Sequence, residues 1–170
     1  EISKAISQRN IDAPVYILKA DGGTLLLEKS IKSPVETIFS GPAASTMGVM
    51  ALTPPGQTSV VVDIGGTTTD LALILDGEPL ISSEGAKVDS FLTHIRAFAV
   101  KSVALGGDSH VKATGDKMTV GPERAGPAFC LGGPEPTPTD AMKFLNMIEI
   151  GDSSLAEKTM TKLGQELNCL

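Results

Sequence analysis

The stretch VVVDIGGTTTDLALILDGEPL, residues 60–80, interrupts a strand pattern with glycines, hydroxyls and carboxylates. Valines at positions 60–62 lead into Asp63, the pair Gly65-Gly66 follows, and apolar residues resume after Asp70. β-Branched and apolar residues on both sides predict two strands, 59–63 and 70–76, joined by a tight loop. This loop carries more polar groups than a reversal of the backbone requires.

The residue types in the loop favour a phosphate ligand. Glycine has no Cβ, so its backbone N–H groups can approach an anion closely, and the hydroxyls of Thr67, Thr68 and Thr69 add donors. The flanking carboxylates would repel a bare phosphate. A divalent cation between carboxylate and phosphate removes that repulsion, so the pattern indicates a magnesium-bound nucleotide.

An ordinary hairpin turn is the alternative interpretation of the same residues. Gly-Gly-Thr-Thr is compatible with a simple reversal, and aspartate is common at the edges of turns. A lone Gly-Gly-Thr would favour that interpretation. Two aspartates that flank the loop between two strand patterns favour binding instead.

Composition and charge exclude several classes of protein. The chain has 170 residues, of which 41% are hydrophobic and 20% charged, near the averages for a soluble globular protein. A net charge of −6 argues against binding to nucleic acid. No apolar run approaches the ~20 residues of a membrane helix, so no membrane partner is expected. Cys130 and Cys169 share no motif spacing, which favours a reduced, cytoplasmic protein.

The remaining elements are predicted from periodicity and turn residues. They are the tail of a helix before Pro14, a hairpin over 15–30, a helix over 42–52 that starts near Ser40, a strand over 79–83, a buried strand over 101–107, a loop over 115–138, a helix over 140–145 and a final helix over 154–167. The predicted fold class is α/β, a mixed β-sheet flanked by helices.

Several motifs carry a resemblance to a known family. VVVDIGGTTTDLALI resembles the second phosphate loop of the superfamily of actin, sugar kinases and heat-shock chaperones, and SGPAASTMGVMAL resembles its connecting helix. IKSPVETIFSGPAAS, DIGGTTTD, ALGGDS and VGPERAGPAFCLGGPEPTPTDA, in this order, are similar to the hydantoinase A and 5-oxoprolinase family. The resemblance covers about residues 15–145 and implies an actin-like ATPase (ribonuclease-H-like) lobe.

The resemblance also implies a chemistry. Members of this family use ATP and Mg²⁺ to open cyclic amides such as hydantoins or 5-oxoproline, and related subunits serve ATP-dependent ketone carboxylases. By this resemblance Asp63 and Asp70 would hold magnesium or position the attacking group. The implied contacts to the terminal phosphates are Gly65, Gly66, Thr67 and Thr68.

Two further loops are candidates for the nucleotide cleft. Gly106 and Gly107 follow a predicted strand, where clefts open in α/β sheets, and a tight turn at the strand exit explains them equally well. Asp108 and Ser109 could touch metal, nucleotide or substrate. Gly41 lies in the first turn of a helix, where N–H groups are free, although a capped structural helix is nearly as good an explanation.

Other polar residues receive structural interpretations. Cys130 is expected to be a small buried side chain, because no histidine lies near it in sequence. His94 and His110 are expected to be structural or surface residues. Thr137 and Asp140, in PTPTDA, are expected to cap the helix that follows.

We expect the chain to be one partial domain over 1–170, with a leading hairpin and connecting helix (1–53), a phosphate-loop lobe (59–145) and a C-terminal helix (146–170). Family subunits are much longer and carry an earlier phosphate loop, which is not found before Ile11. The isolated chain is therefore expected to supply one wall of a cleft, to bind nucleotide weakly and to be inactive. A second enzyme subunit is an implied partner. A noncatalytic actin-like interaction module and a small-molecule kinase are the alternative functions.

Overall fold

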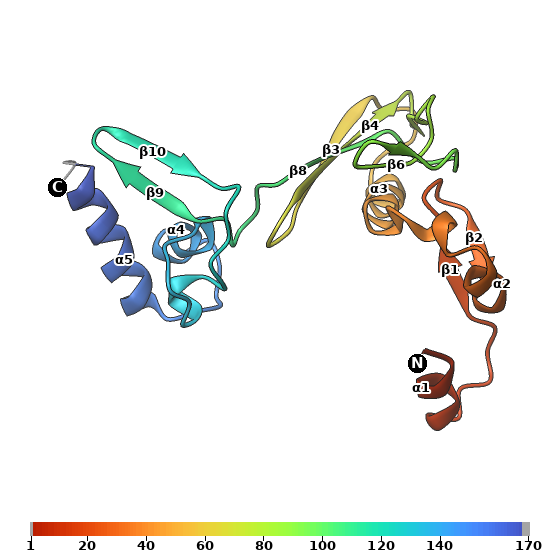
Figure 1. Ribbon diagram of the computed structural model, residues 1–170, viewed down its shortest axis with the longest axis horizontal. Coiled ribbons are helices and arrows are strands. Elements are labelled where there is room, and N and C mark those ends of the chain that lie inside the picture. The colour runs from red at the N-terminus through yellow and green to blue at the C-terminus, as the bar shows by residue number, and fades with distance from the viewer. Residues whose placement is uncertain (1, 168–170) are drawn as a thin grey trace. The chain divides into compact units, whose positions relative to one another are not determined.

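The chain divides into two compact units in a computed structural model that describes residues 2–167. The first unit comprises residues 1–61 and 72–100, and the second comprises residues 62–71 and 101–170 (Figure 1). Within residues 2–167, every helix is too short or too polar to cross a bilayer.

The first unit begins with the short helix α1 (Ile2–Gln8) and the predicted hairpin. Strands β1 (Tyr16–Leu18) and β2 (Thr24–Leu26) pair antiparallel, and the Asp21 carboxylate accepts a hydrogen bond from Gly23 N–H at 3.1 Å in the turn. The prediction of strand up to residue 30 was wrong. Helix α2 (Leu27–Lys32) follows β2 directly, and leucine, glutamate and lysine in its sequence LEKSIK are good helix formers.

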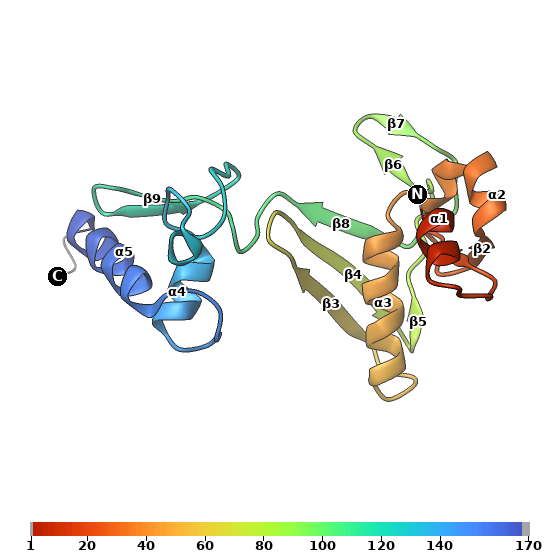
Figure 2. The same cartoon turned by 90° about the horizontal axis from the view of Figure 1, so that it is seen from below.

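The connecting helix α3 (Ser40–Leu52) confirms the predicted helix over 42–52 and extends it by two residues. A 3₁₀ turn, η1 (Pro34–Thr37), precedes it, and Phe39 enters it with a left-handed backbone at φ 62°. Figure 2 shows α3 beside the strands β3 and β4. Val49 and Met50 of this helix pack on a buried cluster of the sheet, formed by Val61, Ala72 and Ile74.

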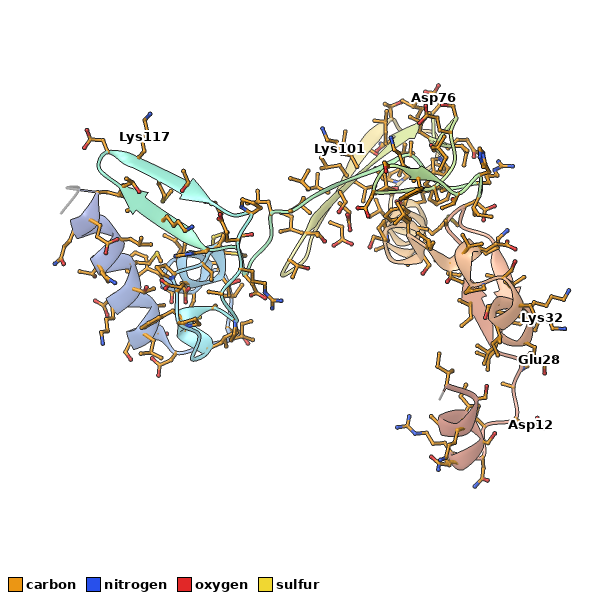
Figure 3. The ribbon with its side chains drawn as sticks, in the orientation of Figure 1. Asp12, Glu28, Lys32, Asp76, Lys101 and Lys117 are labelled. Carbon is orange, nitrogen blue, oxygen red and sulfur yellow. The ribbon has the colours of Figure 1, made fainter. Side chains whose placement is uncertain are left out.

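The sheet contains β3 (Ser59–Ile64), β4 (Thr69–Leu75) and β5 (Glu78–Pro79) in that order, and β8 (Val100–Val103) also pairs with β4. The strands predicted at 59–63 and 70–76 are confirmed. Asp76 (φ 51°) and Gly77 (φ 83°) form the reversal before β5 (Figure 3). The strand predicted over 79–83 is wrong beyond Pro79, since Ile81 makes only an isolated bridge to Phe98.

A small hairpin completes the first unit. Strands β6 (Lys87–Val88) and β7 (Phe91–Leu92) pair antiparallel. A second buried cluster of small side chains, Ala20, Ala86 and Ala97, packs with Ile95.

The second unit holds β9 (Val111–Thr114), β10 (Lys117–Val120), the 3₁₀ turn η2 (Phe129–Leu131), α4 (Pro138–Phe144) and α5 (Ser153–Glu166). Helix α5 packs against α4, η2 and β9. A buried cluster in this unit is formed by Ala128, Cys130 and Ala156. The helices predicted over 140–145 and 154–167 are confirmed.

Two sequence predictions for the second unit were wrong. Residues 117–120 form a strand instead of a loop, because Gly115 (φ 59°) supports a reversal that pairs Thr114 with Lys117. The segment expected as a buried strand over 101–107 has only β8, and its residues Lys101–Val103 are exposed. The prediction of a buried strand rested on the apolar residues of this segment, and Val103 among them is exposed.

Candidate functional site

The loop between β3 and β4 is a tight turn that faces solvent. Gly65 N–H donates to the Thr68 carbonyl oxygen at 2.9 Å, and this bond closes the turn. Gly65, Gly66 and Thr67 are exposed. Among the described residues, no protein acceptor is found for the N–H groups of Gly66 and Thr67. The turn therefore presents backbone donors outward.

A second loop, residues 105–109, lies against this turn within the second unit. Gly107 N–H donates to Gly65 O at 2.9 Å, and Asp108 N–H donates to Gly66 O at 2.7 Å. The Thr69 hydroxyl donates to Leu105 O at 2.6 Å. The structure thus brings together two candidate loops that lie far apart in the sequence.

The glycines at this contact have a steric reason. A Cβ on Gly106 would lie 2.5 Å from the carbonyl oxygen of Gly66 and 2.6 Å from that of Gly65. A Cβ on Gly66 would lie 2.8 Å from Oδ2 of Asp108. Glycine is therefore required at position 106 for the two loops to touch, whereas a side chain at position 66 would displace the Asp108 carboxylate.

Asp63 and Asp70 flank the turn on its two strands. Successive side chains of a strand alternate between faces, so Asp63 shares the face of Val61 and Asp70 shares the face of Ala72. Val61 and Ala72 belong to the same buried cluster, so strand alternation puts the two carboxylates on one face, at the loop end of their strands. Both are half-buried.

This donor set fits magnesium only in part. Within residues 2–167, no group of three or more histidine, cysteine, aspartate or glutamate side chains could hold a metal ion. Magnesium commonly uses one or two carboxylates and completes its shell with waters and substrate phosphates. Two carboxylates on one face beside an outward-facing turn suit that mode of binding.

The 105–109 loop has its own internal support. The hydroxyl of Ser109, which is 3% exposed, accepts a hydrogen bond from Gly106 N–H at 2.8 Å. The Thr139 N–H and hydroxyl both donate to Gly107 O, at 3.1 and 2.8 Å. Ser109 and Thr139 thus stabilise the loop through hydrogen bonds to the backbone of Gly106 and Gly107. Thr139 was missed from sequence, because nothing in its spacing signals this contact.

Asp108 makes an ion pair that the sequence also did not reveal. Its Oδ2 lies 2.7 Å from Nη2 of Arg124, and the two side chains are 20% and 46% exposed. Sixteen positions separate them in the chain, and Arg124 lies in an irregular segment, so neither spacing nor periodicity could have paired them.

The remaining candidates lie elsewhere or are structural. Gly41 belongs to the first unit, in the first turn of α3, and is exposed. Nε2 of His110 lies 3.3 Å from Oε2 of Glu135. His94 has a left-handed backbone, with a φ of 57°. The turn at Asp21 joins β1 and β2 in the hairpin that was expected within residues 15–30.

Asp140 and Thr137 form the capping box predicted for α4. The Asp140 carboxylate, which is fully buried, accepts from Thr137 N–H and from its hydroxyl at 2.8 and 2.9 Å. It also accepts from the N–H groups of Phe129 and Cys130, at 3.1 and 2.6 Å. The same carboxylate therefore anchors both α4 and η2.

Cys130 has the buried structural role that was expected of it. Its thiol is free and packs in the cluster with Ala128 and Ala156. Burial, followed by the hydrogen bond to Asp140, raises the pKa of the Cys130 thiol to about 11. Such a thiol is protonated at neutral pH, which disfavours a nucleophilic role. Cys169 lies outside the described residues.

The chain is similar in sequence to a protein family and to several known proteins. Residues 1–168 match the family model described as Hydantoinase/oxoprolinase. The gamma subunit of acetophenone carboxylase from Aromatoleum aromaticum is 33% identical over 69% of this chain and 17% of its own length. A 5-oxoprolinase from Pestalotiopsis fici is 31% identical over 80% of this chain and 11% of its own length.

A solved structure shares the fold. The nucleotide-free structure of acetone carboxylase superposes on 98% of this chain and 26% of its own chain with a TM-score of 0.80, at 23% identity. This likeness confirms the predicted α/β fold, a mixed β-sheet flanked by helices. The chain spans about a quarter or less of the length of each of these three proteins. Because the family model covers nearly every residue, the chain belongs to the Hydantoinase/oxoprolinase family.

Proposed function

We propose that this chain is the nucleotide-facing core of an enzyme that hydrolyses a cyclic amide, of the hydantoin or 5-oxoproline type, at the expense of ATP. The observation that carries the proposal is the outward-facing turn 65–68, locked by hydrogen bonds to the loop 105–109. Membership of the Hydantoinase/oxoprolinase family and similarity to a 5-oxoprolinase support the substrate class.

In this proposal the turn binds the terminal phosphates. The N–H groups of Gly66 and Thr67 and the hydroxyls of Thr67 and Thr68 donate to phosphate oxygens, while Gly65 closes the turn. Gly106 and Gly107 keep the second loop against it. Gly41, at the start of α3, is a further proposed nucleotide contact.

Asp63 and Asp70 are the proposed magnesium ligands, directly or through water, or they position the attacking group. Mg-ATP bound there would supply a phosphoryl group to the amide oxygen, which makes the amide carbon open to attack by water before the C–N bond breaks. The two carboxylates, on one face of the sheet, would hold the magnesium ion in a fixed position beside the phosphates. A second enzyme subunit and a reduced cytoplasmic setting belong to the same proposal.

Calorimetry with Asp63→Asn and Asp70→Asn tests the assignment. We expect the native protein to bind ATP in a magnesium-dependent way. In each variant the affinity for Mg-ATP should fall about tenfold or more, since a metal ligand is removed. Phosphate release stimulated by a hydantoin or by 5-oxoproline should fall with it. Asp89→Asn is a matched control, because Asp89 is exposed and its left-handed backbone suits asparagine.

A ketone carboxylase subunit is the second candidate function. Similarity to the acetophenone carboxylase gamma subunit, at 33% identity, favours it specifically. ATP turnover that requires a ketone together with bicarbonate, and ignores cyclic amides, would select this function. Native protein without magnesium-linked affinity for ATP or ADP would overturn both and leave a noncatalytic interaction module.

A further inference from the structure

Asp108 places a negative charge directly against the proposed phosphate turn. Its N–H donates to Gly66 O at 2.7 Å, and its Oδ2 would lie 2.8 Å from a Cβ on Gly66. The carboxylate thus lies over the Cα of a residue whose own N–H faces outward. An uncompensated carboxylate at this place would repel any polyphosphate that the turn could bind.

Arg124 supplies the compensation. Its Nη2 lies 2.7 Å from Asp108 Oδ2. The neighbouring acidic residue, Glu123, does not compete for the guanidinium, because its carboxylate pairs with Lys112 at 3.5 Å. Within the described residues, Asp108 is the carboxylate with which Arg124 forms an ion pair.

The guanidinium keeps further hydrogen-bonding capacity after pairing. Arginine has five N–H donors, and the bond to Asp108 uses Nη2. The Arg124 side chain is 46% exposed, so it remains partly open to solvent while it is paired. A planar guanidinium can hold a carboxylate on one side and a phosphate oxygen on the other.

We propose that Arg124 is a specificity-determining residue of the phosphate turn, which cancels the charge of Asp108 beside Gly66 and so admits a polyphosphate to residues 65–68. This role rests on the proposed function, because it assumes that the turn binds nucleotide. It assigns Asp108 and Arg124 to one charge-balanced unit, in which neither residue acts alone.

Calorimetric titration of Mg-ATP against four proteins tests the role. Arg124→Ala leaves a bare carboxylate at the turn, so binding should weaken about tenfold. Asp108→Asn leaves a bare guanidinium, so binding should tighten about threefold. The double variant Asp108→Asn/Arg124→Ala removes both charges and should return to within about threefold of the native protein.

Four further measurements separate the effect of charge from that of structure. Lys162→Ala breaks the exposed Lys162–Glu166 pair in α5 and should change affinity less than about twofold, as exposed pairs do. Added salt should shrink the effect of Arg124→Ala, and Arg124→Lys should restore most of the affinity, since it restores the charge. AMP, which lacks the terminal phosphates, should be affected little by any variant.

The outcomes distinguish this inference from the proposed function. A double variant as weak as Arg124→Ala alone would show that the pair only supports the loop, and the inference would fail while nucleotide binding stands. Native protein that does not bind Mg-ATP would overturn the proposed function and the inference with it. Thermal unfolding followed by circular dichroism verifies that each variant is folded.

Discussion

At the scale of single residues, Asp140 connects more of the second unit than its position in a capping motif suggests. Four donors converge on its carboxylate, from Thr137, Phe129 and Cys130. A buried carboxylate is tolerated only where such bonds replace its hydration. The half of this network that lies within PTPTDA follows from the capping box and is predictable from sequence. The half that reaches η2 depends on tertiary contact and carries no local signal.

Cys130 yields a prediction about stability and pH. The folded thiol has its pKa raised to about 11 from an ordinary value of 9.0, chiefly by burial. Between these values the unfolded chain releases a proton that the folded chain retains, so the unfolded state is favoured as pH rises. The contribution of Cys130 to the free energy of unfolding should be complete below about pH 9 and should be lost as pH rises through about 11.

Urea unfolding between pH 8 and 11 checks this contribution, on a Cys169→Ser background so that Cys130 is the sole thiol. Comparison with Cys130→Ala on the same background removes the effect of lysine and tyrosine titration. The parent should lose stability more steeply with pH than the alanine variant. Equal slopes in the two proteins would show that the thiol ionises alike in both states.

At the scale of secondary structure, the elements that the sequence predicts best are those with their own turn or cap chemistry. The Asp21-Gly22-Gly23 and Asp76-Gly77 reversals, helix α3 and helix α5 all follow from local signals. The errors fall where local signals compete. Glycine and proline density masked strand β10, and three leucines before Glu28 suggested a longer strand where a helix begins.

The contact between the two loops is testable through Gly106. Its replacement by alanine would press a Cβ against the carbonyl oxygens of Gly65 and Gly66, and backbone atoms cannot yield as a flexible side chain does. We expect Gly106→Ala to lower the free energy of unfolding by about 2 kcal/mol, in the range of overpacked sites. Mg-ATP binding should be lost with the geometry of the turn.

Gly48→Ala is the matched control for this variant. Gly48 lies within α3, and a Cβ there would meet no atom within 4 Å. Alanine should therefore stabilise the protein by about 0.5–1 kcal/mol through its helix propensity. Urea unfolding of both variants should give shifts of opposite sign. A Gly106→Ala protein of native stability and native affinity would refute the steric account of the paired loops.

At the scale of the whole molecule, the fold class was predictable, and the contacts of the candidate site only in part. The strand-turn-strand pattern of residues 59–76 identified the turn and its two carboxylates. The turn is bonded by the Asp108 N–H, which donates to Gly66 O, and the adjacent Thr69 hydroxyl donates to Leu105 O. These bonds join segments 36 or more positions apart. Periodicity and turn chemistry report on neighbours in sequence, so contacts of this range were inaccessible to them.

The division into two compact units predicts how the molecule unfolds. Contacts concentrate within residues 1–61 with 72–100 and within residues 62–71 with 101–170, so each set should exchange its amide hydrogens as its own cooperative unit. Asp140→Ala removes the carboxylate that anchors α4 and η2, and leaves buried donors unpaired at a cost of about 3 kcal/mol. Hydrogen exchange followed by mass spectrometry should then accelerate in the second unit and stay unchanged in the first.

The reciprocal variant makes the test symmetrical. A Cβ on Gly77 would lie 2.6 Å from the backbone nitrogen of Gly56, and its φ of 83° disfavours any other residue. Gly77→Ala should therefore accelerate exchange in the first unit and spare the second. Asp116→Ala, at the exposed turn of the β9–β10 hairpin, should change neither. If either core variant accelerates exchange in both units to the same extent, the chain unfolds as a single cooperative structure and the division has no energetic meaning.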